Sequence, residues 1–191
     1  MSKYVTFQQI TKLIYTHLYS SAMLFFLGIF VFAGVVASEI GSVIYSSIAT
    51  VIYFFSIYNA AVDVCHRDKK SFTQEQPYKF KGLLLPIGLL VVSILLYLLY
   101  LVTWKYMTIN SLLYSAQGYI NNILFMMWTF PFNAFIGLED GFMNIYGYVI
   151  VAVFPFIASF LGYLAAYNNY DITSTISKLI YTTNDKEKNK K

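Results

Sequence analysis

The densest group of side chains suited to chemistry follows the second apolar run of the chain. It comprises Asp63, Cys65, His66, Arg67 and Asp68. An imidazole, a thiol and two carboxylates are metal-ligand types, but consecutive residues of a helix point in different directions. We therefore expect this corner to contact lipid headgroups, and a corner that binds a partner or ligand is the alternative.

No recognised catalytic motif accompanies this group. The sequence has no HExxH, no glycine-rich phosphate loop and no GxSxG elbow. Cys65 is the only cysteine, which excludes an internal disulfide and a multi-cysteine metal site. We predict a protein that is not an enzyme, with no cofactor and no metal site.

The elements that must position these residues are apolar. Hydrophobic residues make up 58% of the chain, charged residues only 12%, and the mean hydropathy is +0.60. Four runs can each cross about 30 Å of hydrocarbon: residues 18–37, 40–61, 83–103 and 146–166. The sequence thus predicts an all-α, multi-pass membrane protein with one transmembrane domain over residues 18–170.

The positive charges predict how the chain is oriented. Counted from the N-terminus, the segments outside the four runs carry two, none, five, one and five Lys or Arg residues. By the positive-inside rule, this alternation predicts that both termini and the loop 62–82 are cytoplasmic. The net charge of +4 is then a matter of topology and anionic headgroups, and nucleic acid is not an expected partner.

The flanking segments are expected to lie at the membrane surface. Residues 1–17 are predicted to form an interfacial amphipathic segment, and residues 171–191 an amphipathic, then basic, cytoplasmic tail. In the outer loop 104–145, residues 123–138 are too short to span and contain Pro131. We expect this segment to lie in the outer leaflet or re-enter it, with Trp128, Phe130, Phe132 and Phe135 at the interface.

Two helix faces are candidates for function or for packing. The run 40–61 has a hydroxyl-rich face that could line a pathway or seal against neighbouring helices, and the run 146–166 has a small-residue face suited to helix contact. None of the four runs contains an ionisable residue in its interior. The first face comprises Ser42, Ser46, Thr50, Tyr53, Ser56 and Asn59, and the second Ala158, Gly162 and Ala166.

Several short motifs resemble a loosely defined group of uncharacterised small multi-span membrane proteins from low-GC Gram-positive bacteria. They are His66-Arg67-Asp68, Lys79-Phe80-Lys81-Gly82-Leu83, Phe130-Pro131-Phe132, Gly162-Tyr163 and Ser177-Lys178-Leu179-Ile180-Tyr181. The resemblance covers roughly residues 60–181 and implies no activity or ligand.

The expected function is association within a membrane. The leading hypothesis is an accessory protein, scaffold or complex subunit of the plasma membrane, which contacts anionic headgroups and either a second copy or another membrane protein. The alternative is a small transporter or channel subunit with a pathway along the hydroxyl-rich face. The candidate cytoplasmic contact residues are His66, Arg67, Asp68, Lys69, Lys70, Lys79 and Lys81.

Overall fold

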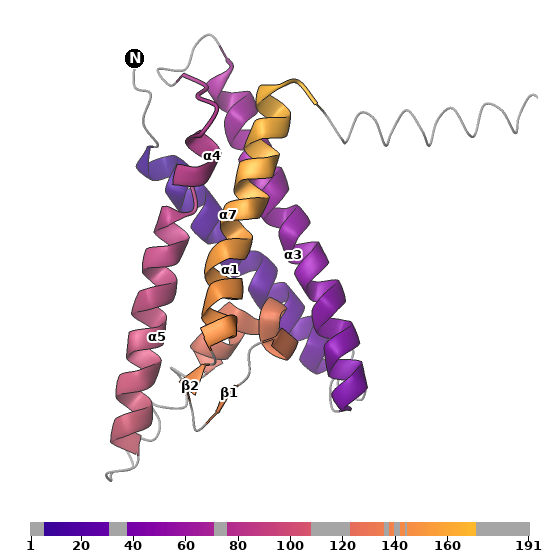
Figure 1. Cartoon of the computed structure of the whole chain (residues 1–191), viewed down its shortest axis with the longest axis vertical. Coiled ribbons are helices and arrows are strands. Elements are labelled where there is room, and N and C mark those ends of the chain that lie inside the picture. Colours follow the sequence, from indigo (N-terminus) through magenta and orange to yellow (C-terminus); the bar gives the residue numbers. More distant parts are fainter. Residues whose placement is uncertain are drawn as a thin grey trace, which may run out of the picture.

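Long helices make up most of the computed structural model (Figure 1). The model describes residues 6–30, 38–70, 76–107, 123–135, 138–139, 142–143 and 145–170. The helices are α1 (Phe7–Phe30), α3 (Glu39–Asp68), α5 (Ile87–Met107) and α7 (Ile145–Tyr167), and the four candidate spans that they supply are long and apolar enough to cross a membrane. The prediction of an all-α, four-span membrane protein is confirmed.

Helix α1 begins well before the predicted span. It is continuous over 24 residues from Phe7, so residues 7–17 are not a separate interfacial helix. Its early turns are packed inside the bundle, where Gln9, Leu13 and His17 are all buried. The predicted boundary at residue 18 is wrong because these polar side chains find partners within the protein and do not mark the edge of the membrane.

Helix α3 also extends further than predicted. It begins at the N-cap residue Ser38, whose hydroxyl accepts a hydrogen bond from the backbone N–H of Gly41 at 3.1 Å. It continues to Asp68, two turns beyond the predicted end at residue 61. The first part of the predicted loop 62–82 is therefore helix, and His66 and Arg67 in its last turn suit the negative end of the helix dipole.

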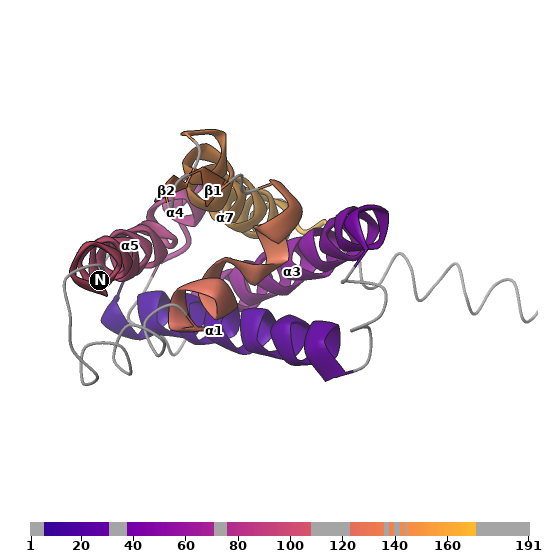
Figure 2. The same cartoon turned by 90° about the horizontal axis from the view of Figure 1, so that it is seen from below.

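Helices α3 and α7 pack closely through the small-residue face of α7. Ala158 and Ala166 are buried there, and a β-carbon added to Gly162 would overlap the carbonyl oxygen of Tyr58. Only a residue without a side chain allows the two backbones to approach this closely. Seen from below, α7 lies over α3, with α1 on the other side of α3 (Figure 2).

Helix α5 stands at the edge of the bundle (Figures 1 and 2). A short helix, α4 (Lys81–Leu84), precedes it, and Leu85 and Pro86 form the turn between the two. Pro86 directly precedes the first turn of α5, where the missing N–H costs nothing. Much of α5 is exposed and apolar, including Val91, Leu95 and Leu99, as expected of a helix that faces lipid.

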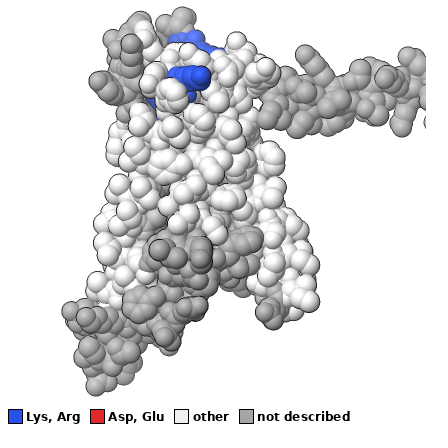
Figure 3. Space-filling view, viewed as in Figure 1, with Lys and Arg blue, Asp and Glu red and all other residues white. Residues whose placement is uncertain are grey.

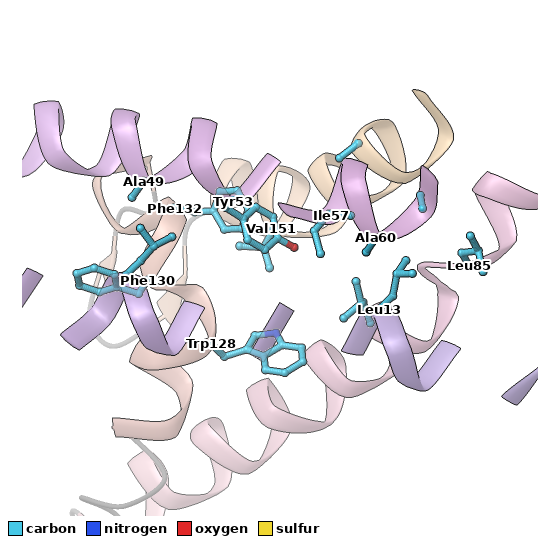
Figure 4. Packing of buried hydrophobic residues seen from close by; sticks show 14 of the residues in the cluster. Leu13, Ala49, Tyr53, Ile57, Ala60, Leu85, Trp128, Phe130, Phe132 and Val151 are labelled. Carbon is cyan, nitrogen blue, oxygen red and sulfur yellow. The ribbon is translucent and has the colours of Figure 1, made fainter. Parts of the chain in front are cut away.

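Residues 123–135, which form the Pro131 segment, are inserted into the bundle. Residues 123–129 are helical and continue into the 3-10 helix η1 (Phe130–Phe135), which contacts α1, α3 and α7. Trp128, Phe130 and Phe132 are buried among these helices (Figure 4). The expected interfacial position of these aromatics is therefore wrong. Gly28 of α1 makes room for the insertion, since a β-carbon there would lie 2.6 Å from Cζ of the Phe130 ring.

A small hairpin joins this segment to the last helix. Strands β1 (Leu138–Glu139) and β2 (Phe142–Met143) pair antiparallel, with Leu138 opposite Met143. Figure 1 places η1 and the hairpin at the same end of the bundle, near the beginning of α7. The segment therefore occupies one half of the bundle and does not cross it.

Candidate functional site

The charged side chains that the structure describes gather at one end of the bundle (Figure 3). Here the beginning of α1, the end of α3, α4 and the end of α7 lie together (Figure 1). Six residues are basic and two are acidic, so this end has a clear excess of positive charge. They are Lys12, Arg67, Lys69, Lys70, Lys79 and Lys81, with Asp63 and Asp68.

A buried ion pair lies at the centre of this basic end. The Lys81 ammonium is 2.9 Å from Oδ2 of Asp68, and both side chains are fully inaccessible to solvent. Gln9 donates from Nε2 to Oδ1 of Asp68 at 2.7 Å, and the Tyr163 hydroxyl donates to Oδ2 at 2.7 Å. The carboxylate is thus held by groups from α1, α4 and α7, while it belongs to α3 itself.

This network corrects the predicted role of two residues. Asp68 and Lys81 were expected to contact headgroups, but their burial removes them from the membrane surface. The structure brings together three of the short motifs noted in the sequence, those containing Asp68, Lys81 and Tyr163. Gly82 permits this, because a β-carbon there would lie 2.7 Å from Cβ of Tyr163.

Lys69 also has a structural role. Its ammonium donates to the carbonyl oxygens of Ala166 at 2.5 Å and Tyr167 at 3.1 Å, and to Oδ1 of Asn169 at 2.7 Å. These carbonyls are among those that a helix leaves unpaired at its C-terminus. Lys69 therefore fastens the end of α7 to the end of α3, and Asn169 adopts the left-handed conformation typical of such helix ends.

The remaining candidate contact residues lie on the surface of the basic end. His66, Arg67, Lys70 and Lys79 are exposed. Lys79 also lies 5.9 Å from the ring centre of Phe80, a partly exposed aromatic residue. These four residues, together with the exposed Lys69, are the part of the predicted contact set that a headgroup or a partner can reach.

A second buried polar cluster surrounds His17. Its Nδ1 lies 2.7 Å from the Tyr53 hydroxyl, and its Nε2 lies 3.2 Å from the backbone oxygen of Trp128. A carbonyl can only accept, so Nε2 carries the proton and Nδ1 accepts from Tyr53. The four predicted runs contain no ionisable residue in their interior, but α1 begins earlier than the first of them, so the candidate span Phe7–Phe30 includes His17.

The hydroxyl-rich face of α3 is partly sealed by the Pro131 segment. The hydroxyls of Ser46 and Thr50 donate to the carbonyl oxygen of Pro131 at 3.3 and 2.5 Å. Ser42 and Ser56 are half-buried, and Asn59 is exposed. The face is thus divided among an interior contact with η1, the Tyr53–His17 contact and more open positions.

Three pockets among the described residues have an exposed surface that is almost entirely apolar, although residues with hydroxyls, such as Ser47 and Thr50, contribute to their walls. One lies between α1 and α3, one between α3 and α7, and one between α5, α7 and the helix 123–129. Within the described part of the chain, no three His, Cys, Asp or Glu residues converge as metal ligands would. The geometry supports precise packing of helices and offers an exposed basic surface.

Comparison with protein-family models, with curated proteins and with solved structures found no match for this chain.

Proposed function

We propose that the protein is a non-enzymatic accessory protein, scaffold or small complex subunit of a bacterial plasma membrane. The observation that carries this proposal is the contrast at the basic end. Asp68 and Lys81 are locked inside the bundle, whereas His66, Arg67, Lys70 and Lys79 cover its surface. A buried ion pair that fixes the helices, surrounded by exposed basic side chains, suits association with anionic headgroups or an acidic surface of a membrane partner.

The same charges support a cytoplasmic location for this end. The loop between α3 and α5 begins and ends at this end of the bundle (Figure 1). The start of α1 and the end of α7 also lie here (Figure 1). Cytoplasmic segments of membrane proteins carry an excess of Lys and Arg. The proposed orientation therefore has both termini inside, and η1 and the β1–β2 hairpin toward the outside.

The alternative function, a transporter or channel subunit, has less support. Ser46 and Thr50 direct their hydroxyls to the Pro131 carbonyl, and Tyr53 directs its hydroxyl to His17. Hydroxyls that are already bonded within the protein do not provide a row of free groups for a solute. The pathway hypothesis would require the Pro131 segment to leave α3.

The association can be tested on protein extracted in its native lipid with a nanodisc-forming polymer. Light scattering and mass spectrometry would then measure its size against the 21.9 kDa chain and identify associated proteins and lipids. We expect an assembly larger than one chain, and we expect Arg67→Glu with Lys79→Glu to release the partner. The matched control is the double variant Lys12→Asp with Asp63→Lys, which preserves the net charge. In the native protein, Nζ of Lys12 lies 3.1 Å from Oδ2 of Asp63 at the surface. A strictly monomeric protein without a co-purifying partner would refute the proposal.

The orientation can be tested with an impermeant thiol reagent on intact cells. Single cysteines would replace Asn110, Asn144 or Asn189 in a Cys65→Ser background. The proposed orientation predicts labelling at Asn110 and Asn144 and protection at Asn189. Labelling at Asn189 would place the tail outside and contradict the cytoplasmic assignment of the basic end.

A further inference from the structure

A crevice of about 110 Å³ separates α5 from α7. Ile94, Tyr97 and Leu98 of α5 form one wall, and Val151 of α7 contributes to the other. Helix 123–129 provides Phe125 and Trp128, which also line the crevice and are themselves buried. The crevice exists because α5 stands away from α7 and the inserted segment bridges the two only in part.

The crevice is continuous with the surface of the protein that faces the bilayer. Ile94 and Leu98 line it, yet each is 51% exposed. They share that outer surface with Leu95 and Leu99, in the middle of a helix of 21 residues. Since α5 supplies one of the candidate spans, this opening lies at the depth of the hydrocarbon chains.

The chemistry of the crevice suits a ligand without polar groups. Its lining contains no charged residue, and its exposed surface is almost entirely apolar. On the α5 side the lining residues with hydroxyls are Ser93 and Tyr97, and the Ser93 hydroxyl accepts a hydrogen bond from Nε1 of Trp128 at 2.9 Å. Thr129 donates its hydroxyl to the carbonyl oxygen of Phe125 at 2.9 Å. The crevice therefore offers very little polar surface to a headgroup or a polar solute.

We propose that this crevice binds one acyl chain of a membrane lipid, which enters sideways between α5 and α7. The site is independent of the association function proposed above. A second copy of the protein is a poorer occupant, because close helix contact in membranes uses small residues and the exposed side of α5 carries Ile, Leu and Val. A flexible hydrocarbon chain fits a narrow apolar crevice without requiring a matching surface.

Trp128 connects this site to the interior of the bundle. Its ring centre lies 3.9 Å from that of His17, and its backbone oxygen accepts from the same imidazole. His17 in turn bonds Tyr53 of α3. A chain seated against Trp128 therefore contacts the residue that joins the inserted segment to α1 and α5 directly, and to α3 through His17. This makes Trp128 the natural reporter of occupancy.

The test uses the fluorescence of Trp128. The chain has two tryptophans, so Trp104→Phe leaves Trp128 as the only one. This variant would be reconstituted in phosphatidylcholine vesicles with or without bromine atoms in the middle of the acyl chains. Although Trp128 is only 4% exposed, we expect brominated chains to quench most of its emission.

Two substitutions on α7 distinguish a chain in the crevice from lipid that merely surrounds the protein. Ala152 lines the crevice, whereas Val153 is 44% exposed on the same helix. We expect Ala152→Phe to restore the Trp128 emission and the matched control Val153→Phe to leave the quenching unchanged. If Ala152→Phe prevents folding, Ala152→Leu provides a smaller obstruction with the same expected direction.

Two results would overturn the proposal. Trp128 emission that is insensitive to brominated lipid would show that no chain reaches the crevice. Equal quenching in the Ala152 and Val153 variants would show that the bromine atoms act from outside it. A lipid carrying a mid-chain diazirine gives an independent readout, because illumination must leave adducts on Tyr97 or Phe125.

Discussion

The buried ion pair between Asp68 and Lys81 makes a quantitative prediction. Replacing Lys81 with Met leaves a carboxylate in the interior without its ionic partner. Removing one member of a buried pair costs about 3–5 kcal/mol. Asp68 still accepts hydrogen bonds from Gln9 and Tyr163 in this variant. We therefore expect the lower end of that range, about 3 kcal/mol.

The reverse change should cost more. Asp68→Asn leaves a buried ammonium, and Asp68 provides the only ion pair that the described residues give Lys81. We expect a loss of about 5 kcal/mol for this variant. The double variant Asp68→Asn, Lys81→Met buries no charge, and its cost should be smaller than that of either single change. The stability losses should therefore be strongly non-additive.

The measurement is equilibrium unfolding in mixed micelles as the fraction of a denaturing detergent is raised, followed by circular dichroism. The matched control is Lys79→Met, which removes an exposed lysine two residues from Lys81 and should cost no more than about 1 kcal/mol. The reasoning is refuted if Lys81→Met resembles this control. It is equally refuted if the two single losses add up to the loss in the double variant.

Three further predictions concern other contacts. Gly162→Ala should destabilise the protein by about 1–3 kcal/mol in the same unfolding experiment, because its methyl group would overlap the Tyr58 carbonyl on the facing backbone; an unchanged midpoint would mean that α3 and α7 are not in such close contact. His17→Phe should cost about 1–3 kcal/mol, since the Tyr53 hydroxyl loses its acceptor, and a second substitution, Tyr53→Phe, should recover part of that loss. Cys65 is fully buried, so a membrane-permeant thiol reagent should label it only after denaturation; rapid labelling of the folded protein would contradict the packing around it.

The sequence predicts the architecture well where hydropathy and periodicity act over many residues. The four candidate spans and the small-residue face of α7 arise from such long patterns, and Gly162 lies on that face against α3. Each of these features averages over a whole helix, so no single partner needs to be known. A pattern averaged over a whole helix does not locate the residues at which the helix begins and ends, so the predicted boundaries are wrong by up to two or three turns.

The errors at the boundaries have a common physical cause. A polar residue next to an apolar run indicates the edge of a span only if its polar groups reach water. Gln9, His17 and Asp68 instead find their hydrogen-bond partners on other elements, at separations of 36 to 111 residues along the chain. Local sequence contains no signal for such pairings, so the buried clusters could not be predicted.

The aromatic residues of the Pro131 segment illustrate the opposite error. Tryptophan and phenylalanine near a predicted loop are typical of a membrane interface. Trp128 and Phe130 are buried because α1 offers a space at Gly28 and a hydrogen-bond partner at His17. The sequence signal for this burial is that residues 123–138 contain no Asp, Glu, Lys or Arg.

The two ends of the bundle are held together by different kinds of contact. At the basic end, a charged network and the Lys69 cap join the helices through strong, directional bonds. At the other end, the inserted segment contacts its neighbours through aromatic rings and through hydrogen bonds with His17, Ser46, Thr50 and Ser93. Removing such neutral hydrogen bonds costs less than breaking a buried ion pair. Local opening should therefore begin around the inserted segment, while the basic end stays folded.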